Sequence, residues 1–300
     1  MDVFEAGILP VNSQEAFDVL RAGWTKVAAV PKVVSNETVA VLNSPLAVFS
    51  MLLCGEDTAG QIGLYHQAVP AGADVPGHHQ NSEDEGFYIL EGRWRFVAGE
   101  DAREVGPGDL IYAPVGTTHA FRPLDDEGGD LISWNAPAGH ERFYTGMMAS
   151  AMQGENPFQM AAPNYRTFFE GVAEGDAPLP RHMSSWQKAS PMFSFRADAP
   201  EKRLEGAVIA TLLAPEMSGG RTEAVEISVE GPGVETPHDL AGAARILHVL
   251  EGRWHVRAGE LEAIVGRGQT VFVPGDVALS YRSDSEGPAR LFFLAEQLNS

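Results

Sequence analysis

The chain is poor in cysteine and in positive charge, and both deficits exclude classes of protein. Its 300 residues include one cysteine, Cys54, which excludes an intrachain disulfide and a cysteine-rich zinc site. Lysine and arginine total 21 against 41 aspartates and glutamates, a formal net charge of −20. Phosphate backbones and anionic lipid surfaces repel a chain this acidic, so we expect neither nucleic acid nor a membrane as a partner.

Long apolar runs and several common catalytic motifs are also missing. No window contains the roughly 20 apolar residues that cross a bilayer, and the first residues lack the basic start and apolar stretch of a signal peptide. We therefore expect a cytoplasmic protein. The sequence has no GxGxxG after a strand, no P-loop, no HExxH, no GxSxG and no CxxC.

An internal repeat is the strongest feature that is present. ILEGRWRFVAGE at 89–100 reappears as VLEGRWHVRAGE at 249–260. The same offset maps Gly92 onto Gly252 and Pro114 onto Pro274 without gaps. A period as long as a whole domain indicates a duplicated domain rather than a solenoid.

Each copy has the pattern of an all-β domain. Short runs rich in Val, Ile, Phe, Tyr and Trp, such as GFYIL, LIYAP, RILHVL and ARLFFL, alternate with Gly and Pro turns, which favours a sandwich or barrel. Helical spacing is confined to residues 13–23, 140–152 and 165–172. We expect a first domain at 1–154, a helical or irregular segment at 155–190 and a second domain at 191–300.

The first copy contains PGHHQNSEDEGFYILEG at 76–92 and GDLIYAPVGTTHAFR at 108–122, two spaced motifs that resemble those of the cupin family. The first runs from Gly72 through five residues to His78, then Gln80, Glu85 and Gly92; Gln80 stands where the family has a second histidine. The second motif consists of Gly108, Pro114, Gly116 and His119, with Pro123 in place of the family's asparagine. The resemblance implies two tandem barrels of the double-stranded β-helix, or jelly-roll, type.

The motif residues predict a metal site in the first barrel. Strand alternation places His78 and Gln80 on one face and His79 on the other, unless a bulge turns His79 inward. Glu85 enters the next strand, and His119 comes from a separate strand. Two imidazoles and a carboxylate suit a divalent transition metal; Fe²⁺ is favoured, and Ni²⁺, Mn²⁺ or Zn²⁺ also fit. Gln80 is expected to be a weak or indirect ligand.

The second copy keeps the glycines of the fold but not the ligands. His238 corresponds to His78, whereas Leu240, Arg245 and Leu279 replace Gln80, Glu85 and His119. We expect this barrel to be a metal-free packing partner. The alternative is a second ligand pocket in which Arg245 pairs with an acid.

The segments EDEGFYILEGR and GTTHAFR are similar to those of two-domain quercetin dioxygenase-like cupins. This resemblance implies a metal-dependent dioxygenase for a phenolic, flavonol-like or polyketide-like small molecule, with Glu85 as the catalytic base. A non-oxidative cyclase or isomerase and a metal-free binding protein are the alternatives. We expect an apolar pocket that includes Phe87, Trp94 and Phe121, and a homodimer.

A methionine cluster (Met147, Met148, Met152 and Met160) is interpreted as core packing, or as a lid over the pocket.

Overall fold

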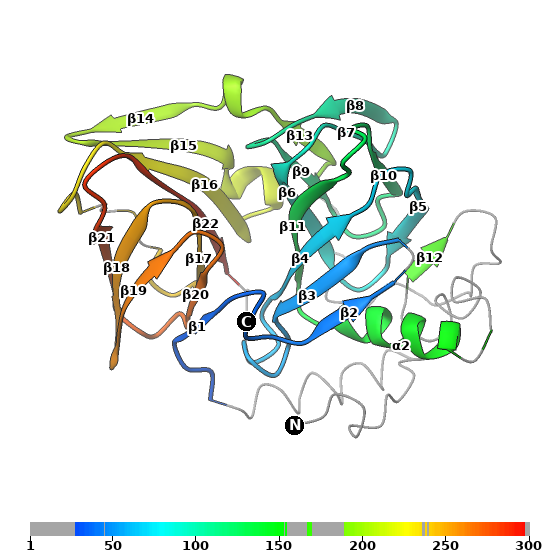
Figure 1. Ribbon diagram of the computed structural model, residues 1–300, viewed down its shortest axis with the longest axis horizontal. Coiled ribbons are helices and arrows are strands. Elements are labelled where there is room, and N and C mark those ends of the chain that lie inside the picture. The colour runs from blue at the N-terminus through cyan, green and yellow to red at the C-terminus, as the bar shows by residue number, and fades with distance from the viewer. Residues whose placement is uncertain are drawn as a thin grey trace. The chain divides into compact units, whose positions relative to one another are not determined.

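The computed structural model describes residues 28–297 except 45, 153, 155–166, 170–188, 236–237 and 239. The helix expected at 13–23 therefore lies outside the described residues. The described chain divides into two compact units (Figure 1). Ala40–Phe193 form the first unit, and Ala28–Val39 together with the residues from Ser194 onward form the second.

The described residues of the first unit form two antiparallel sheets and one helix. The larger sheet has the strand order β13-β9-β6-β11-β4-β3-β2, and the smaller has the order β12-β5-β10-β7-β8. Its elements are β2 (Val41–Asn43), β3 (Val48–Leu53), β4 (Gly63–Val69), β5 (Val75–Gln80), β6 (Asp84–Glu91), β7 (Trp94–Ala98), β8 (Asp101–Val105), β9 (Leu110–Ala113), β10 (His119–Pro123), β11 (Gly129–Ala136), α2 (Glu141–Met152), β12 (Thr167–Phe169) and β13 (Met192–Ser194).

The second unit repeats this plan. Its larger sheet has the order β1-β20-β17-β22-β16-β15-β14, and its smaller sheet has the order β19-β18-β21. Its elements are β1 (Lys32–Val34), η2 (Arg196–Asp198), β14 (Glu201–Leu204), β15 (Ala207–Leu213), η3 (Pro215–Ser218), β16 (Thr222–Val229), β17 (Ala244–Glu251), β18 (Arg253–Ala258), β19 (Leu261–Gly266), β20 (Thr270–Val273), β21 (Leu279–Ser283) and β22 (Ala289–Glu296).

The offset that relates the two sequence repeats also relates their strands. β6 and β17, β9 and β20, β10 and β21, and β11 and β22 keep this same offset at both of their ends. Their pairing is equivalent as well, since Glu85 lies opposite Ala113 and Arg245 lies opposite Val273. The prediction of an all-β chain with two tandem jelly-roll barrels is confirmed.

One pair of equivalent strands is exchanged between the repeats. β1 and β13, at Lys32–Val34 and Met192–Ser194, are also related by the offset of the repeat. β13 borders β9 in the first unit, whereas β1 pairs with β20 in the second, with Val33 opposite Val271. The edge strand of each large sheet therefore comes from the segment that precedes the other repeat in the chain.

Aromatic side chains fill the space between the two sheets of the first unit. Phe87 of the larger sheet lies 5.2 Å and 5.3 Å, between ring centroids, from Phe96 and Phe121 of the smaller sheet. Trp94 packs beside Phe121 and is fully buried. In the second unit Trp254 occupies the position equivalent to Trp94 and is also fully buried. The shared register of the repeats thus places the same tryptophan in each core.

The segment after the first barrel is partly helical and partly extended. The expected helix at 140–152 is confirmed as α2. The expectation of a helix at 165–172 is wrong at residues 167–169, which form β12 and pair antiparallel with Gln80, His79 and His78 of β5. The open edge of β5 offers this segment backbone hydrogen bonds, which outweigh a helical spacing in a stretch rich in Thr and Phe.

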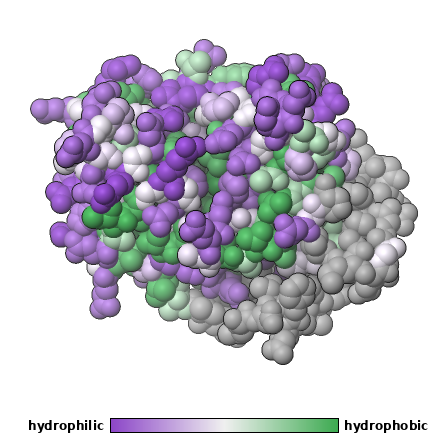
Figure 2. All heavy atoms as spheres, viewed as in Figure 1, coloured by the Kyte–Doolittle hydropathy of each residue, from purple (hydrophilic) through white to green (hydrophobic). Residues whose placement is uncertain are grey.

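Hydrophilic side chains cover much of the face seen in Figure 2, with apolar patches between them. Within the described ranges, no helix combines the length and the apolar character needed to span a bilayer.

Candidate metal centre and cavity

Two histidines of the first unit are cross-strand neighbours in the smaller sheet. His78 of β5 lies opposite His119 of β10. Each imidazole Nδ1 contacts a backbone carbonyl two residues upstream, at 2.8 Å from Pro76 for His78 and at 2.9 Å from Thr117 for His119. Because a carbonyl only accepts hydrogen bonds, both Nδ1 atoms carry a proton, so Nε2 is the atom with which each ring can bind a metal ion.

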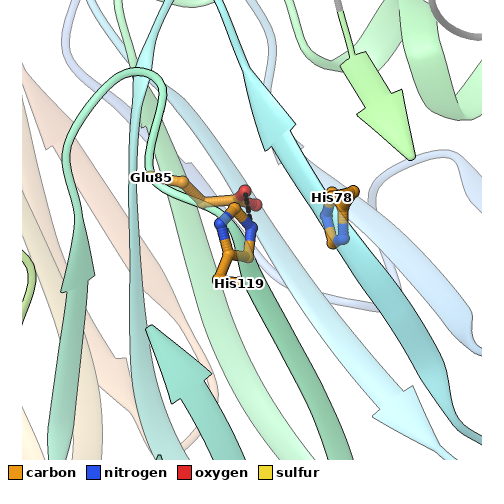
Figure 3. Close-up of side chains that lie close together, drawn as sticks. All are labelled: His78, Glu85 and His119. Carbon is orange, nitrogen blue, oxygen red and sulfur yellow. Dashed lines mark hydrogen bonds and ion pairs between the residues drawn. The ribbon is translucent and has the colours of Figure 1, made fainter. Parts of the chain in front are cut away.

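Glu85 reaches these histidines from β6 of the larger sheet. Its Oε2 lies 3.0 Å from Nε2 of His119 (Figure 3). His78, Glu85 and His119 are all buried, and one ligand atom from each lies within 4.8 Å of the others. Among the described residues, this group has the composition and spacing of a site for a metal ion.

The charges of the group fit a bound cation. Burial, together with the neighbouring His119, lowers the pKa of His78 to about 3, so its ring is neutral at physiological pH. Burial raises the pKa of Glu85, but the hydrogen bond of His119 and the nearby histidines outweigh it and hold that pKa below its usual value. Because Nδ1 of His119 already donates to a carbonyl, the 3.0 Å contact between its Nε2 and Oε2 of Glu85 requires a second proton or a metal ion between the two atoms.

Gln80 lies two residues after His78 on β5, so strand alternation places it on the same face of the sheet. Its side chain is buried, and its Nε2 has no hydrogen-bond partner among the described residues. A buried amide without a partner is costly, so this group is suited to a water or a ligand. His79 is half-buried and pairs across the strands with Phe168. The irregular pairing of β5 lies before His78 and therefore does not reverse His79 relative to His78.

A cavity of about 420 Å³, open solvent included, adjoins the metal group. Its wall is mostly apolar, with two of the three metal-group residues and several polar side chains on it. The lining residues are Leu46, Phe49, Gln67, Val75, His78, Glu85, Phe121, His140, Phe143, Tyr144 and Met147. A mostly apolar wall with a few polar side chains is typical of sites that bind small, largely apolar molecules.

The structure distributes the predicted pocket residues between the wall and the core. Phe121 lines the cavity, whereas Phe87 and Trp94 are fully buried in the aromatic cluster. Phe87 lies 5.6 Å from His119, edge to face, and so backs the metal group. Met147 lines the cavity from α2. A role of the three aromatic residues in substrate binding stays a prediction.

Several polar residues near the cavity were not foreseen from the sequence. His140 lines it and is paired with the buried carboxylate of Glu83, at 3.0 Å between Nδ1 and Oε1. Gln67 donates to Ser133 at 2.6 Å and to the hydroxyl of Tyr144 at 3.3 Å. The sequence held one signal for this wall, because positions 140, 143, 144 and 147 share one helical face.

The equivalent position in the second unit is occupied by a cation. Arg245 stands where Glu85 stands in the first unit, and it is almost completely buried. Its guanidinium donates to the carbonyls of Pro274 and Val277. A guanidinium in this position opposes a second metal ion there by charge and by volume.

Comparison with known proteins agrees with the fold. A profile described as "Cupin domain" matches residues 65–135, the segment that contains all three members of the metal group. The solved oxalate decarboxylase of Lactobacillus farciminis superposes with a TM-score of 0.62 over 90% of this chain and 87% of that chain, at 13% identity. The chain has the two-barrel fold of a bicupin, and its first barrel contains a cupin domain. A Bacillus subtilis oxalate decarboxylase gives a TM-score of 0.63 over 91% of this bicupin and 79% of that chain, also at 13% identity.

Two sequence relatives each match less than a third of this chain. A dimethylsulfoniopropionate lyase of Ruegeria pomeroyi is 33% identical over 81 residues, which is 27% of this chain and 40% of the lyase. A quercetin 2,3-dioxygenase of Bacillus subtilis is 27% identical over 89 residues, which is 30% of this chain and 26% of the dioxygenase. These alignments span less than half of either relative.

Proposed function

We propose that this bicupin is a metal-dependent enzyme that acts on a small phenolic, flavonol-like or polyketide-like molecule in the cavity of its first barrel. The observation that carries the proposal is the buried group of two imidazoles and one carboxylate, within 4.8 Å, beside a mostly apolar cavity. Of the reactions considered, dioxygenation is our first candidate. The similarity to a quercetin 2,3-dioxygenase supports it.

The residues that would hold the metal are His78, Glu85 and His119, with Gln80 as a weak or indirect partner. Fe²⁺ is favoured by two imidazoles and one carboxylate with open positions, although Ni²⁺, Mn²⁺ and Zn²⁺ also suit these donors. When bound, such a cation supplies Lewis acidity that lowers the pKa of a substrate hydroxyl.

Glu85 would act as the proton acceptor. Its carboxylate lies on the cavity wall and has a lowered pKa, so it is ionised at neutral pH and able to take a proton from a substrate oxygen. Phe121 and Phe143 border the same cavity, where they would hold an aromatic skeleton and exclude water. The first step is thus deprotonation of a substrate hydroxyl, whichever reaction follows.

A non-oxidative reaction is the second candidate, and a specific observation favours it. The relative with 33% identity is a lyase, and the superposed structures are decarboxylases. Gln80 also replaces the second histidine of the motif, which weakens the argument for an oxygenase. A cyclase or isomerase would use the same deprotonation and then proceed without oxygen.

Elemental analysis and oxygen consumption distinguish these functions. Protein purified without chelators should contain close to one equivalent of divalent transition metal, and His119→Ala should lose most of it. Oxygen uptake with quercetin, and with simpler flavonols, is the expected result for a dioxygenase. Metal content with substrate turnover but no oxygen uptake would favour the non-oxidative enzyme. Wild-type protein that carries no metal after incubation with each of the four ions would overturn the proposal in favour of a binding protein.

A further inference from the structure

A second buried pair of titratable groups lies outside the metal group. His140 directly precedes α2 and Glu83 directly precedes β6, and their Nδ1 and Oε1 atoms are 3.0 Å apart. The side chains are 2% and 4% exposed, so water screens this pair poorly. The contact to Glu83 is the one hydrogen bond of the His140 ring within the described part of the chain.

The geometry leaves the far nitrogen of this ring for the cavity. Glu83 occupies Nδ1, and the imidazole is part of the cavity wall while Glu83 is not. A carboxylate on Nδ1 with Nε2 available is the arrangement by which enzymes orient a histidine for proton transfer. His78 and Glu85 line the same cavity as His140, so one small molecule can reach both the metal group and His140.

Packing holds the imidazole in this orientation. Its ring centroid lies 5.0 Å from that of Phe143 and 4.7 Å from that of Tyr144, the latter edge to face. The adjacent Glu141 is fixed in turn, because its carboxylate accepts hydrogen bonds from Gly55 N at 2.9 Å and from the hydroxyl of Tyr65 at 2.9 Å. The start of α2 is therefore anchored to the barrel, and so is His140.

The surrounding charges favour a proton on this ring. Burial lowers the pKa of His140, but the hydrogen bond to Glu83 and the carboxylates of Glu85, Glu83 and Glu141 outweigh burial and raise the pKa above its usual value. The other titratable side chains nearby are His78, Tyr144 and Tyr65, which are neutral at physiological pH. A raised pKa makes the neutral ring a stronger proton acceptor than an unperturbed imidazole.

We propose that His140, oriented by Glu83, is a second proton-transfer residue of this cavity. The substrate then carries two hydroxyl groups on a flat conjugated skeleton, as catechols do. One oxygen faces Glu85 and the other faces His140, and this assignment rests on the proposed function. The second O–H bond breaks, its electron pair stays on oxygen, and its proton moves to Nε2. The resulting imidazolium is stabilised by Glu83 and returns the proton when the product is formed.

The probe for this proposal is 4-nitrocatechol, whose visible spectrum reports its ionisation state. Zn²⁺-loaded protein, in which the metal is redox-inactive, is titrated with the probe across the pH range. In His140→Gln and His140→Phe, zinc content should match that of the wild type, but the bound probe should lose its second proton at a pH higher by about 1 unit, a tenfold change in that equilibrium. Glu83→Gln should shift the midpoint in the same direction by less.

His255→Gln is the matched control, because His255 also pairs with a glutamate, Glu262 at 2.8 Å, but belongs to the second unit. Midpoints equal in the wild type, the control and both His140 variants would overturn the proposal. The comparison is repeated on metal-free protein. Failure of the wild type to bind zinc would count against the proposed metal function, while the metal-free titration still tests His140.

Discussion

Gln80 occupies a position where a stronger ligand is feasible. A neutral amide oxygen binds a divalent ion less strongly than an imidazole nitrogen, and Gln80 is buried on the face of β5 that carries His78. We expect Gln80→His to raise the affinity for Zn²⁺ at least severalfold, as measured by competition with a chromophoric chelator. Leu240→His, at the equivalent position of the second unit, should gain no affinity. Loss of zinc binding in Gln80→His would show that this side chain does not face the metal group.

Glu85 combines two roles that a single substitution separates. In Glu85→Gln the amide oxygen still ligates weakly, so part of the metal should remain, but the proton acceptor is lost. We expect turnover to fall about 10²–10⁴-fold. Metal content and turnover are measured on the same sample, so that the loss of one is not mistaken for loss of the other. Near-full turnover with metal retained would assign the proton to another group.

The sequence predicted the residues of the metal group but not the pair of His140 and Glu83 beside the cavity. His78, Glu85 and His119 were predictable because strand alternation and motif spacing fix where each points. His140 and Glu83 were not predictable, because neither residue is a position of the two motifs. Their pairing depends on tertiary structure alone. Phe87 and Phe121 are three-dimensional neighbours, 5.3 Å apart, yet only Phe121 reaches the cavity. Spacing along a strand cannot distinguish these two positions.

At the scale of elements, β6 and β11 carry facing residues of complementary size. Gly86 lies opposite Trp134, and a Cβ at Gly86 would overlap the indole ring. In the second unit Ile246 lies opposite Leu294 at the equivalent positions. Ile246 is larger than Gly86, and Leu294 is smaller than Trp134. The pair of strands next to Glu85 thus depends on complementary sizes rather than on either residue alone.

We expect Gly86→Ala to destabilise the first unit by about 1–3 kcal/mol through overpacking, as measured by urea unfolding. The double variant Gly86→Ala with Trp134→Leu should recover part of that loss, because the smaller side chain makes room for the methyl group. An additive double variant would show that the two positions do not interact.

In β22, burial gives a carboxyl group an unusual titration. It raises the pKa of Glu296 to about 7, although the hydrogen bond from Thr222 and the charge of Arg221 act in the opposite direction. The unfolded chain loses this proton near pH 4.5 and the folded chain near 7. The group's contribution to stability is therefore complete below about pH 4.5 and is lost as the pH rises toward 7.

Glu296→Gln should remove that pH dependence. In the wild type, the free energy of unfolding should fall between pH 5 and 7 by up to about 1.4 kcal/mol per pH unit from this group. The variant should have a flatter profile in urea unfolding, whereas Glu262→Gln, at an exposed ion pair, should keep the wild-type slope. Parallel profiles for wild type and Glu296→Gln would mean that Glu296 is ionised throughout.

The element level also shows where sequence patterns fail. The paired strands of the two repeats were predicted because turns and β-branched runs recur at the same offset. β12 was missed because Thr167–Phe169 is only 3 residues long and is extended through its pairing with β5. So short a strand has no period of its own and takes its conformation from the edge that it completes.

For the whole molecule, the unequal repeats predict an unequal metal load. The first unit has His78, Glu85 and His119, and the second has Arg245 buried in the equivalent position of Glu85. We expect close to one equivalent of metal per chain, as measured by elemental analysis after dialysis against excess Zn²⁺. Arg245→Ala should leave that value unchanged, since Leu240 and Leu279 supply no ligands. A value near two would contradict the metal-free assignment of the second unit.

The exchanged edge strands have a consequence for how the protein is made. Val34 and Thr270, which pair in the finished sheet, are separated in the chain by the whole first barrel and much of the second. At a synthesis rate of roughly 5–20 residues per second, β1 leaves the ribosome about 10–50 seconds before its partner strand exists. β13 is synthesised before β20, so we expect the first barrel to be completed while β1 still awaits its partner strand. An exposed strand awaiting a late partner is open to pairing with another nascent chain, and rapid folding of the second barrel is what limits that exposure.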